Sequence, residues 1–465
     1  MNALTPVTIT FALMGMALVC VLRPGRAMAV VIAGMLIYPD YLRIPMGLAQ
    51  MSTGRLIALT LLARMFFRPE RGEFRWCWAD SLVACIYLWN LLANVIMDSG
   101  QERMVFLVGN GLDTALLYYV ARIALGRLEH RRDLVVPLCC MLIWLGFWGL
   151  MESFTTRTIY MPFRQYHSWR WMDKGLQFRE LLGFRLLRAE GSASHSIYWG
   201  VSMFVLTGML ISFASLRRYS RLTLVAIGFG LGGVVSSLSS GPQLSTTVFL
   251  GIALLYFRPH WIKTGLIVLV VMGVMAEIAS NRHFYHLVDY LNIAGGGSYY
   301  RNRLLEVAVL NLPEYWMFGY GSPENYPHHW GGQIDGRRHV DVVNHYVLLA
   351  IYSGILSPLL YLIVHGLVLR EAASTWKIAG LRVRRMAYLQ AATLVGVALG
   401  CMAVSLFAPA HGLIYMLMGV MARQPLREPE AFEEYDGEAE DAELDDGDGK
   451  WDEPEPAPRR RGAFA

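Results

Sequence analysis

Long uncharged apolar runs follow one another along most of the chain, and they lack the spaced apolar positions of an amphipathic helix. Most runs are about 17 to 25 residues long, the length that a helix needs to cross the hydrocarbon core of a bilayer. In lipid, only helices and closed barrels satisfy all of their backbone groups, and continuous rather than alternating apolarity selects helices. The pattern therefore predicts an all-α, polytopic integral membrane protein.

Short loops rich in Lys and Arg separate the apolar runs, and loops of this kind stay on the cytoplasmic side. Two helices between successive basic loops, with one helix before the first loop and two after the last, give about 12 to 13 transmembrane helices. They are expected at residues 6–22, 27–39, 47–67, 79–97, 104–121, 134–151, 196–214, 222–239, 243–257, 264–279, 343–367, 387–407 and 409–423. This alternation places two long segments, 152–195 and 280–342, outside the cytoplasm.

Composition supports the membrane prediction, since 55% of the residues are hydrophobic and the mean hydropathy is +0.38. The formal net charge of +5 combines two opposed regions, because the residues from Arg427 onward include 15 acids and only 5 bases. So acidic a segment has too few apolar residues to fold alone. We therefore expect a transmembrane domain over 1–423 and an acidic, disordered cytoplasmic tail over 424–465. All six cysteines lie in or beside expected spans, which argues against disulfide-bonded outer loops.

The outer segment 152–195 carries many basic residues for its side of the membrane. Its stretch FRELLGFRLLR has apolar residues at helical spacing, which predicts an interfacial helix with Arg185 and Arg188 on its other side. Two guanidinium groups at a membrane surface suit a diphosphate headgroup, which Arg binds through paired hydrogen bonds. The alternative is a surface that is only solvated or that lies against lipid headgroups.

The outer segment 280–342 has 63 residues, of which 11 are aromatic, with histidines, arginines and Asp341 among them. Aromatic faces beside polar side chains suit a sugar, whose apolar face stacks while its hydroxyls form hydrogen bonds. The alternative is an interfacial aromatic belt or a core formed within the loop. Its histidines have no second cluster at a recognised ligand spacing and no nearby thiolate, so no metal site is expected.

Two stretches of the second half, YYRNRLLEVAVLNLPEYWMFGYGS and DVVNHYVLLAIYSGILSPLLY, resemble the signature of a known family. This is the O-antigen ligase and Wzy-type polysaccharide polymerase superfamily. Its members carry an Arg that opens a loop helix, a later Gly-x-Gly, and a His/Asn-bearing entry to a span that contains a Gly. The upstream stretch LLRAEGSASHSIYWG is similar to another family element. The matching positions are Arg188, His195, Arg301, Gly319, Gly321, Asn344, His345 and Gly354.

This chain departs from the family pattern at three places. Its small-residue element SSLSSGPQLS has no Arg, and Leu305 stands where the family has Trp. Val343 occupies the position directly before Asn344, where the family His commonly lies, so His345 would have to act from two residues later.

The resemblance implies a GT-C-like, inverting, metal-independent glycosyltransferase without a cofactor, active on the periplasmic side of a bacterial inner (cytoplasmic) membrane. Its donor would be a glycan on undecaprenyl diphosphate. Arg301 and Arg188 would stabilise the diphosphate leaving group, and His345 would be the general base for the acceptor hydroxyl. The expected substrate-binding residues are Arg185, His195, Arg303, His339, Asp341 and Asn344.

The expected partners are the undecaprenyl-diphosphate-linked glycan, membrane lipid and a polysaccharide chain-length regulator, with no nucleic acid. A polymerase of exopolysaccharide or O-antigen is favoured over an O-antigen ligase, because DVVNHYVLLAIYSGILS is more similar to the junction of the polymerases. A lipid-linked glycan flippase is the alternative from another class. A flippase is expected to show internal repeats and charges along its central helices. A non-catalytic assembly subunit also stays open.

Overall fold

A computed structural model describes most of the chain up to residue 424. The described residues are 4–47, 49–68, 74–97, 100–166, 177–181, 183–217, 219–258, 298–321, 329–334, 336, 340–407 and 409–424, with eight isolated positions between 261 and 275. The chain divides into units Met1–Leu426 and Arg427–Ala465, and the second unit lies outside the described residues. So do His339 and most of the span expected at 264–279.

Most of the described residues are helical, and the only sheets among them are two short hairpins. Five described helical segments, one of them Gln101–Ala124 with a break at Thr114, are long and apolar enough to cross a membrane, by length and composition, and four shorter apolar helices accompany them. These findings confirm an all-α membrane protein. The total number of spans and the GT-C arrangement stay predictions.

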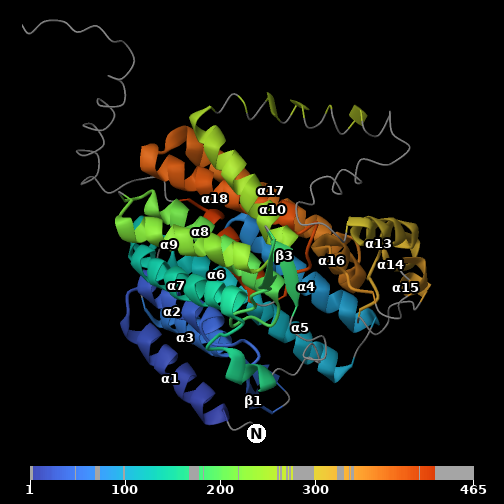
Figure 1. Ribbon diagram of the computed structural model, residues 1–465, viewed down its shortest axis with the longest axis horizontal. Coiled ribbons are helices and arrows are strands. Elements are labelled where there is room, and N and C mark those ends of the chain that lie inside the picture. The colour runs from blue at the N-terminus through green and yellow to red at the C-terminus, as the bar shows by residue number, and fades with distance from the viewer. Residues whose placement is uncertain are drawn as a thin grey trace, which may run out of the picture. The chain divides into compact units, whose positions relative to one another are not determined.

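The first half of the chain forms a series of apolar helices close to the expected spans (Figure 1). Proline begins α2 at its first position, and serine side chains cap α3 and α9, as the local sequence favours. The helices are α1 (Thr5–Val21), α2 (Pro24–Leu36), α3 (Thr53–Phe67), α4 (Trp78–Met97), α5 (Gln101–Asp113), α6 (Ala115–Ala124), α7 (Leu128–Thr155), α8 (Ser196–Ala214), α9 (Arg221–Ser236) and α10 (Ser240–Leu254). The strands β1 (Ile44–Met46) and β2 (Ala49–Met51) pair before α3.

The second half begins, within the described residues, with three helices of the outer segment. These are α13 (Ser298–Leu310), α14 (Leu312–Tyr315) and α15 (His329–Ile334), and they share an apolar cluster with α16 (His345–Ser353) (Figure 1). Three longer helices complete the fold: α17 (Leu356–Ile378), α18 (Leu381–Gly400) and α19 (Ala410–Met421).

Two predicted spans are each divided into two helices. The span expected at 104–121 breaks at Thr114, between α5 and α6. The span expected at 343–367 breaks at Gly354, whose φ is +77°. A β-carbon on Gly354 would lie 2.0 Å from the carbonyl oxygen of Met317, so only glycine allows the outer segment to pack this closely against the break.

The predicted interfacial helix in FRELLGFRLLR is wrong. The structure has an antiparallel hairpin there, with β3 (Phe178–Leu181) paired to β4 (Phe184–Leu187) and Gly183 in the turn at φ +81°. Glycine in mid-helix is costly but favours a turn, and the flanking stretches are short enough to pair as strands. Arg185 lies over the Phe178 ring while Arg188 follows the hairpin, so the two arginines do not share a helix face.

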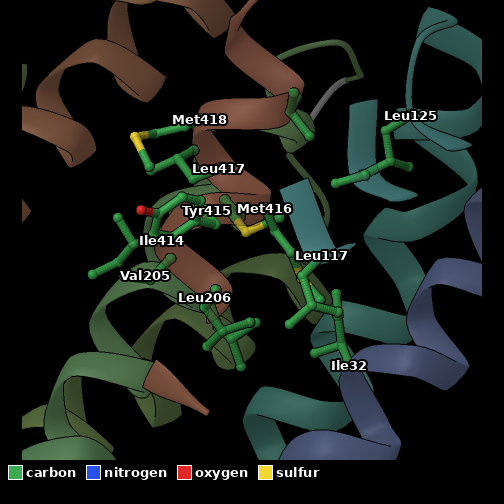
Figure 2. Packing of buried hydrophobic residues seen from close by; sticks show 14 of the residues in the cluster. Ile32, Leu117, Leu125, Val205, Leu206, Ile414, Tyr415, Met416, Leu417 and Met418 are labelled. Atoms are coloured by element: carbon green, nitrogen blue, oxygen red, sulfur yellow. The ribbon is translucent and has the colours of Figure 1, made fainter. Parts of the chain in front are cut away.

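The centre of the protein is formed by α8 and α19, whose side chains are buried on nearly every side. A helix that is apolar all round is expected at such a position. Figure 2 shows α19 residues Ile414 to Met418 packed with Val205 and Leu206 of α8 and with Leu117 of α6. This central packing positions the surrounding helices, among them α9 and α10.

Segments that the sequence predicts on one side of the membrane contact one another in the structure. At one end, the hydroxyl of Ser192 donates to the carbonyl of Leu36. At the other end, Arg68 donates to the carbonyl of Cys20 at 3.0 Å, and Arg122 to that of Arg75 at 3.1 Å. We call the end that includes Leu36 and Ser192 the predicted outer end.

Candidate functional site

Arg188 is attached to the connection between α9 and α10. Its Nη1 donates to Oε1 of Gln177 at 2.6 Å, and its Nε donates to the carbonyl of Ser237 at 3.4 Å. The next residue, Ala189, donates its backbone N–H to the carbonyl of Ser236 at 2.9 Å. The segment after β4 therefore lies along this connection, with the Arg188 guanidinium beside it.

Arg301 reaches the same connection from a distant part of the chain. It lies in the first turn of α13, and its Nη2 donates to Oγ of Ser240 at 3.0 Å. Arg179 of β3 is within electrostatic range of both Arg188 and Arg301. We call Arg179, Arg188 and Arg301 the arginine cluster.

The arginine cluster concentrates positive charge in a partly buried place. Burial, and then the charge of Arg179, lowers the pKa of Arg188 to about 10, although Glu190 opposes this change; the same two causes lower the pKa of Arg301. Within the described residues no carboxylate forms an ion pair with Arg188 or Arg301. An anionic ligand would relieve this repulsion.

The first turn of α10 adds polar groups to the arginine cluster. Ser239 precedes this helix and its side chain does not cap it. The first N–H groups of a helix have no partner within the helix, and they carry a partial positive charge that favours anions. Ser240, which accepts from Arg301, is the first residue of this turn. The arginine cluster and α10 together suit a ligand with several phosphate oxygens.

His345 lies away from this surface, in the interior. Its side chain belongs to a residue that is 1% exposed, and its ring centroid is 4.6 Å from that of His411. The backbone N–H of Leu406 donates to His345 Nδ1 at 3.3 Å. The Nδ1 lone pair is thus occupied, and a neutral ring then carries its proton on Nε2. In this arrangement His345 has no lone pair available to accept a proton from a sugar.

The other residues that the sequence predicts in the site are spread over the predicted outer end. Asn344 caps α16 through hydrogen bonds from Tyr346 N and Val347 N, at 3.0 and 3.1 Å. His195 caps α8, with Nδ1 accepting from Ile197 N at 3.1 Å. Both side chains therefore hold helix ends in this structure.

Arg303 points away from the arginine cluster. It donates to the carbonyl of Gln333 at 2.9 Å and to Glu306 at 2.8 Å. Asp341 is exposed, and its backbone is bound on both sides by the Tyr300 hydroxyl, next to Arg301. The structure thus brings Arg188 and Arg301 together and places Asp341 on a segment tied to the same helix, α13.

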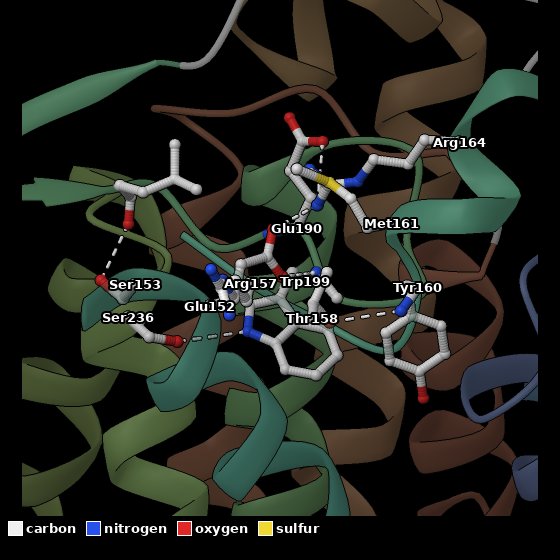
Figure 3. Close-up of polar contacts among 12 residues, drawn as sticks. Glu152, Ser153, Arg157, Thr158, Tyr160, Met161, Arg164, Glu190, Trp199 and Ser236 are labelled. Carbon is white, nitrogen blue, oxygen red and sulfur yellow. Dashed lines mark hydrogen bonds and ion pairs between the residues drawn. The ribbon is translucent and has the colours of Figure 1, made fainter. Parts of the chain in front are cut away.

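A buried acidic residue that the sequence analysis did not single out organises the loop around Arg188. Glu152, at the end of α7, is fully buried and pairs with Arg164, which also lies 3.6 Å from Glu190 (Figure 3). Glu152 further accepts the backbone N–H groups of Glu190 and Gly191, at 3.3 and 2.9 Å. Burial opposes the charge of Arg164, but Glu152 and Glu190 outweigh it and raise the pKa of Arg164.

A small cavity of about 30 Å³ lies at the predicted outer end, between α2, α3 and the α5–α6 break. That volume has room for about one or two water molecules. Arg55 and Asp113 form a two-point ion pair in its wall, at 2.7 and 2.5 Å. Asp40 also lines it, and Oδ1 of Asp40 is enclosed without a hydrogen-bond partner among the described residues.

Asp40 should make stability depend on pH. Burial raises its pKa from 3.8 to about 7, with Arg43 opposing the rise and Asp113 adding to it. The folded protein therefore holds this proton more tightly than the unfolded chain. Protonated Asp40 therefore makes its full contribution to the free energy of unfolding below pH 4, and this contribution is lost as the pH rises through 7. We expect Asp40→Asn to raise the apparent unfolding temperature relative to the wild type at pH 8 but not at pH 4.

Asp341→Asn is the matched control, since that carboxylate is exposed. The measurement is thermal unfolding of both variants and the wild type in lipid nanodiscs at pH 4, 6 and 8. An Asp40→Asn difference that is the same at all three pH values would contradict the assignment of a raised pKa.

Comparisons with known proteins do not assign a function to this chain. No protein-family model and no curated protein matches this chain. The described residues contain no group of three or more His, Cys, Asp or Glu side chains that could hold a metal ion. The arginine cluster is therefore the feature on which a functional assignment rests.

Proposed function

We propose that this chain is a membrane glycosyltransferase that polymerises oligosaccharide units carried on undecaprenyl diphosphate, at the outer face of a bacterial inner membrane. The observation that carries the proposal is the convergence of Arg188 and Arg301 on the Ser237–Ser240 connection, with Arg179 nearby. This is an anion site at one end of a bundle of apolar helices. A diphosphate on a membrane lipid fits both properties.

The proposed reaction requires the protein to stabilise the diphosphate leaving group. As the bond between the sugar C1 and the diphosphate oxygen breaks, negative charge develops on that oxygen. Guanidinium groups and helix N–H groups that are already in place stabilise such charge without reorganisation. Arg301, Arg188 and the first turn of α10 supply these donors, and this explains why arginines rather than lysines stand there.

The acceptor hydroxyl attacks C1 from the opposite side, which inverts the anomeric centre, and its proton passes to a base. We assign this base to Asp341, an exposed carboxylate whose backbone is held by Tyr300, the neighbour of Arg301. The sequence-based choice, His345, would have to lose its hydrogen bond from Leu406 and leave the interior. Its replacement should therefore affect folding more than proton transfer.

Transfer of the glycan to lipid A core would use the same donor and leaving group, so the arginine cluster supports a ligase equally well. The junction DVVNHYVLLAIYSGILS favours the polymerase. The deciding experiment incubates the purified, full-length protein in liposomes with undecaprenyl-diphosphate-linked oligosaccharide. A ladder of lengthened lipid-linked products supports polymerisation. Transfer only to added lipid A core would replace the polymerase by a ligase, and transport without any new glycosidic bond would indicate a flippase.

A further inference from the structure

A second polar group lies inside the apolar core, apart from the arginine cluster. It consists of His345 at the start of α16, Tyr361 and His365 one turn apart on α17, and His411 on α19, which are 1%, 0%, 3% and 6% exposed. Tyr361 links the histidines, since its ring centroid lies 5.5, 4.4 and 6.0 Å from those of His345, His365 and His411. We call these four residues the histidine cluster.

Each member of the histidine cluster has one buried polar atom that no described residue satisfies. These atoms are Nε2 of His345, Oη of Tyr361, Nε2 of His365 and Nε2 of His411. An unsatisfied polar group costs several kcal/mol in a membrane interior, where lipid offers no hydrogen bonds. Four such atoms in contacting side chains need a common explanation.

The hydrogen bonds on the opposite ring nitrogens determine what two of these atoms can do. His345 Nδ1 accepts from Leu406 N, so in a neutral ring its Nε2 carries the proton and is a donor. His365 Nδ1 lies 2.9 Å from the carbonyl of Tyr361 and must donate to it, so its Nε2 is an acceptor. The Tyr361 hydroxyl can do both. The cluster thus offers at least one donor, one acceptor and one group of either kind.

The neighbours of the histidine cluster restrict its ligand. The titratable groups around it are Cys401, Tyr346 and Tyr415, none of which supplies a negative charge at neutral pH. A metal ion needs several lone pairs directed at one point, and within the described residues no such group of side chains exists. A neutral molecule that both donates and accepts meets these conditions, and water does so with two to four partners.

We propose that His345, Tyr361, His365 and His411 enclose an internal water site that joins α16, α17 and α19. Water in this site is expected to accept from Nε2 of His345 and to donate to Nε2 of His365, with the Tyr361 hydroxyl as a further partner. The segment from Cys401 to Leu406 separates this site from α10, because it bonds to His345 on one side and contacts Gly241 through Val404 on the other. The water site is therefore distinct from the arginine cluster and does not depend on the proposed activity.

The test is solid-state NMR of the full-length protein, labelled with ¹⁵N-histidine, in lipid bilayers. Nitrogen shifts report which ring nitrogen carries the proton, and water-edited transfer reports which imidazoles contact water. Signals are assigned by their loss in His345→Asn, His365→Asn and His411→Asn. We expect protonated Nε2 for His345, protonated Nδ1 for His365, and rapid transfer from water to all three rings. Absence of transfer, or the opposite tautomers, would overturn the proposal.

A pair of tyrosine variants separates the water site from a general effect on folding. Tyr361→Phe keeps the ring and removes one polar atom of the site. It should weaken water transfer to His365 by about threefold, since a buried water needs several partners. Tyr346→Phe is the control, because that hydroxyl donates to the carbonyl of Ala398 at 2.7 Å. Equal transfer in the wild type and Tyr361→Phe would also contradict the proposal, whatever the enzymatic activity of either variant.

Discussion

Arg301→Lys is expected to lower the rate of glycan polymerisation by about 10²- to 10³-fold, the usual effect of losing a donor to a developing negative charge. Lysine retains the charge, but it cannot form the paired hydrogen bonds of a guanidinium. Arg301 also contacts Ser240 at the start of α10. The lysine side chain is shorter than that of arginine, so its charge would lie farther from this helix. The measurement is the initial rate of polymer synthesis by purified variants in liposomes, at equal protein content.

Arg303→Lys is the matched control, since Arg303 lies on the same helix and binds Gln333 and Glu306 instead. Its rate should stay within about threefold of the wild type, because its hydrogen bonds go to Gln333 and Glu306 rather than to the Ser237–Ser240 connection. Its partly exposed ion pair with Glu306 also contributes little to stability. Equal losses in both variants would mean that the helix α13, rather than the Arg301 guanidinium, is what the reaction requires. A normal rate for Arg301→Lys would remove Arg301 from the proposed mechanism.

Glu152→Gln is expected to destabilise the protein by about 3 kcal/mol, because it leaves the buried Arg164 with only the more distant Glu190, at 3.6 Å, as a counter-charge. Glu152 is fully buried and holds three groups at once: the Arg164 guanidinium and the backbone N–H groups of Glu190 and Gly191. The amide of glutamine has the same size, but it can accept through one oxygen only. Chemical denaturation in detergent micelles measures the change.

Glu306→Gln is the control for this prediction, because the Arg303–Glu306 pair is partly exposed, at 41% and 32% of the two side chains. It should change the free energy of unfolding by less than about 1 kcal/mol. Similar small losses in the two variants would show that the Glu152 network does not hold the loop. A large loss for Glu152→Gln would also explain how Arg188, two residues from Glu190, keeps its place.

Long apolar runs were enough to predict most of the helices. The observed α1, α2, α4 and α8 begin and end within a few residues of the expected spans, since a continuous apolar segment has few alternatives in lipid. The breaks at Thr114 and Gly354 were not predicted. Each depends on contacts with distant residues, as the approach of Met317 to Gly354 shows. The hairpin at 178–187 was missed because its short apolar pattern fits either a helix or two strands.

The candidate site was predictable only in part. The family resemblance pointed to Arg188 and Arg301 separately, and the structure adds that both bind the serine-rich connection, which lacks the Arg expected there. The burial of His345 could not be read from its motif, because Leu406 and His411 determine it from sixty or more residues away. Glu152 and Asp40 were missed because a single acid at a helix end or in a short connection is common and its partners are remote in sequence.

The most direct test of the proposed activity measures what happens to the lipid-linked donor in an assay with purified protein. Purified protein in liposomes, with undecaprenyl-diphosphate-linked oligosaccharide as the only substrate, should produce a ladder of longer lipid-linked glycans and release undecaprenyl diphosphate in equal amount to the bonds formed. Arg188→Ala and Arg301→Ala should each abolish both products. No lengthening and no released diphosphate, from protein that is folded and correctly inserted, would contradict the account.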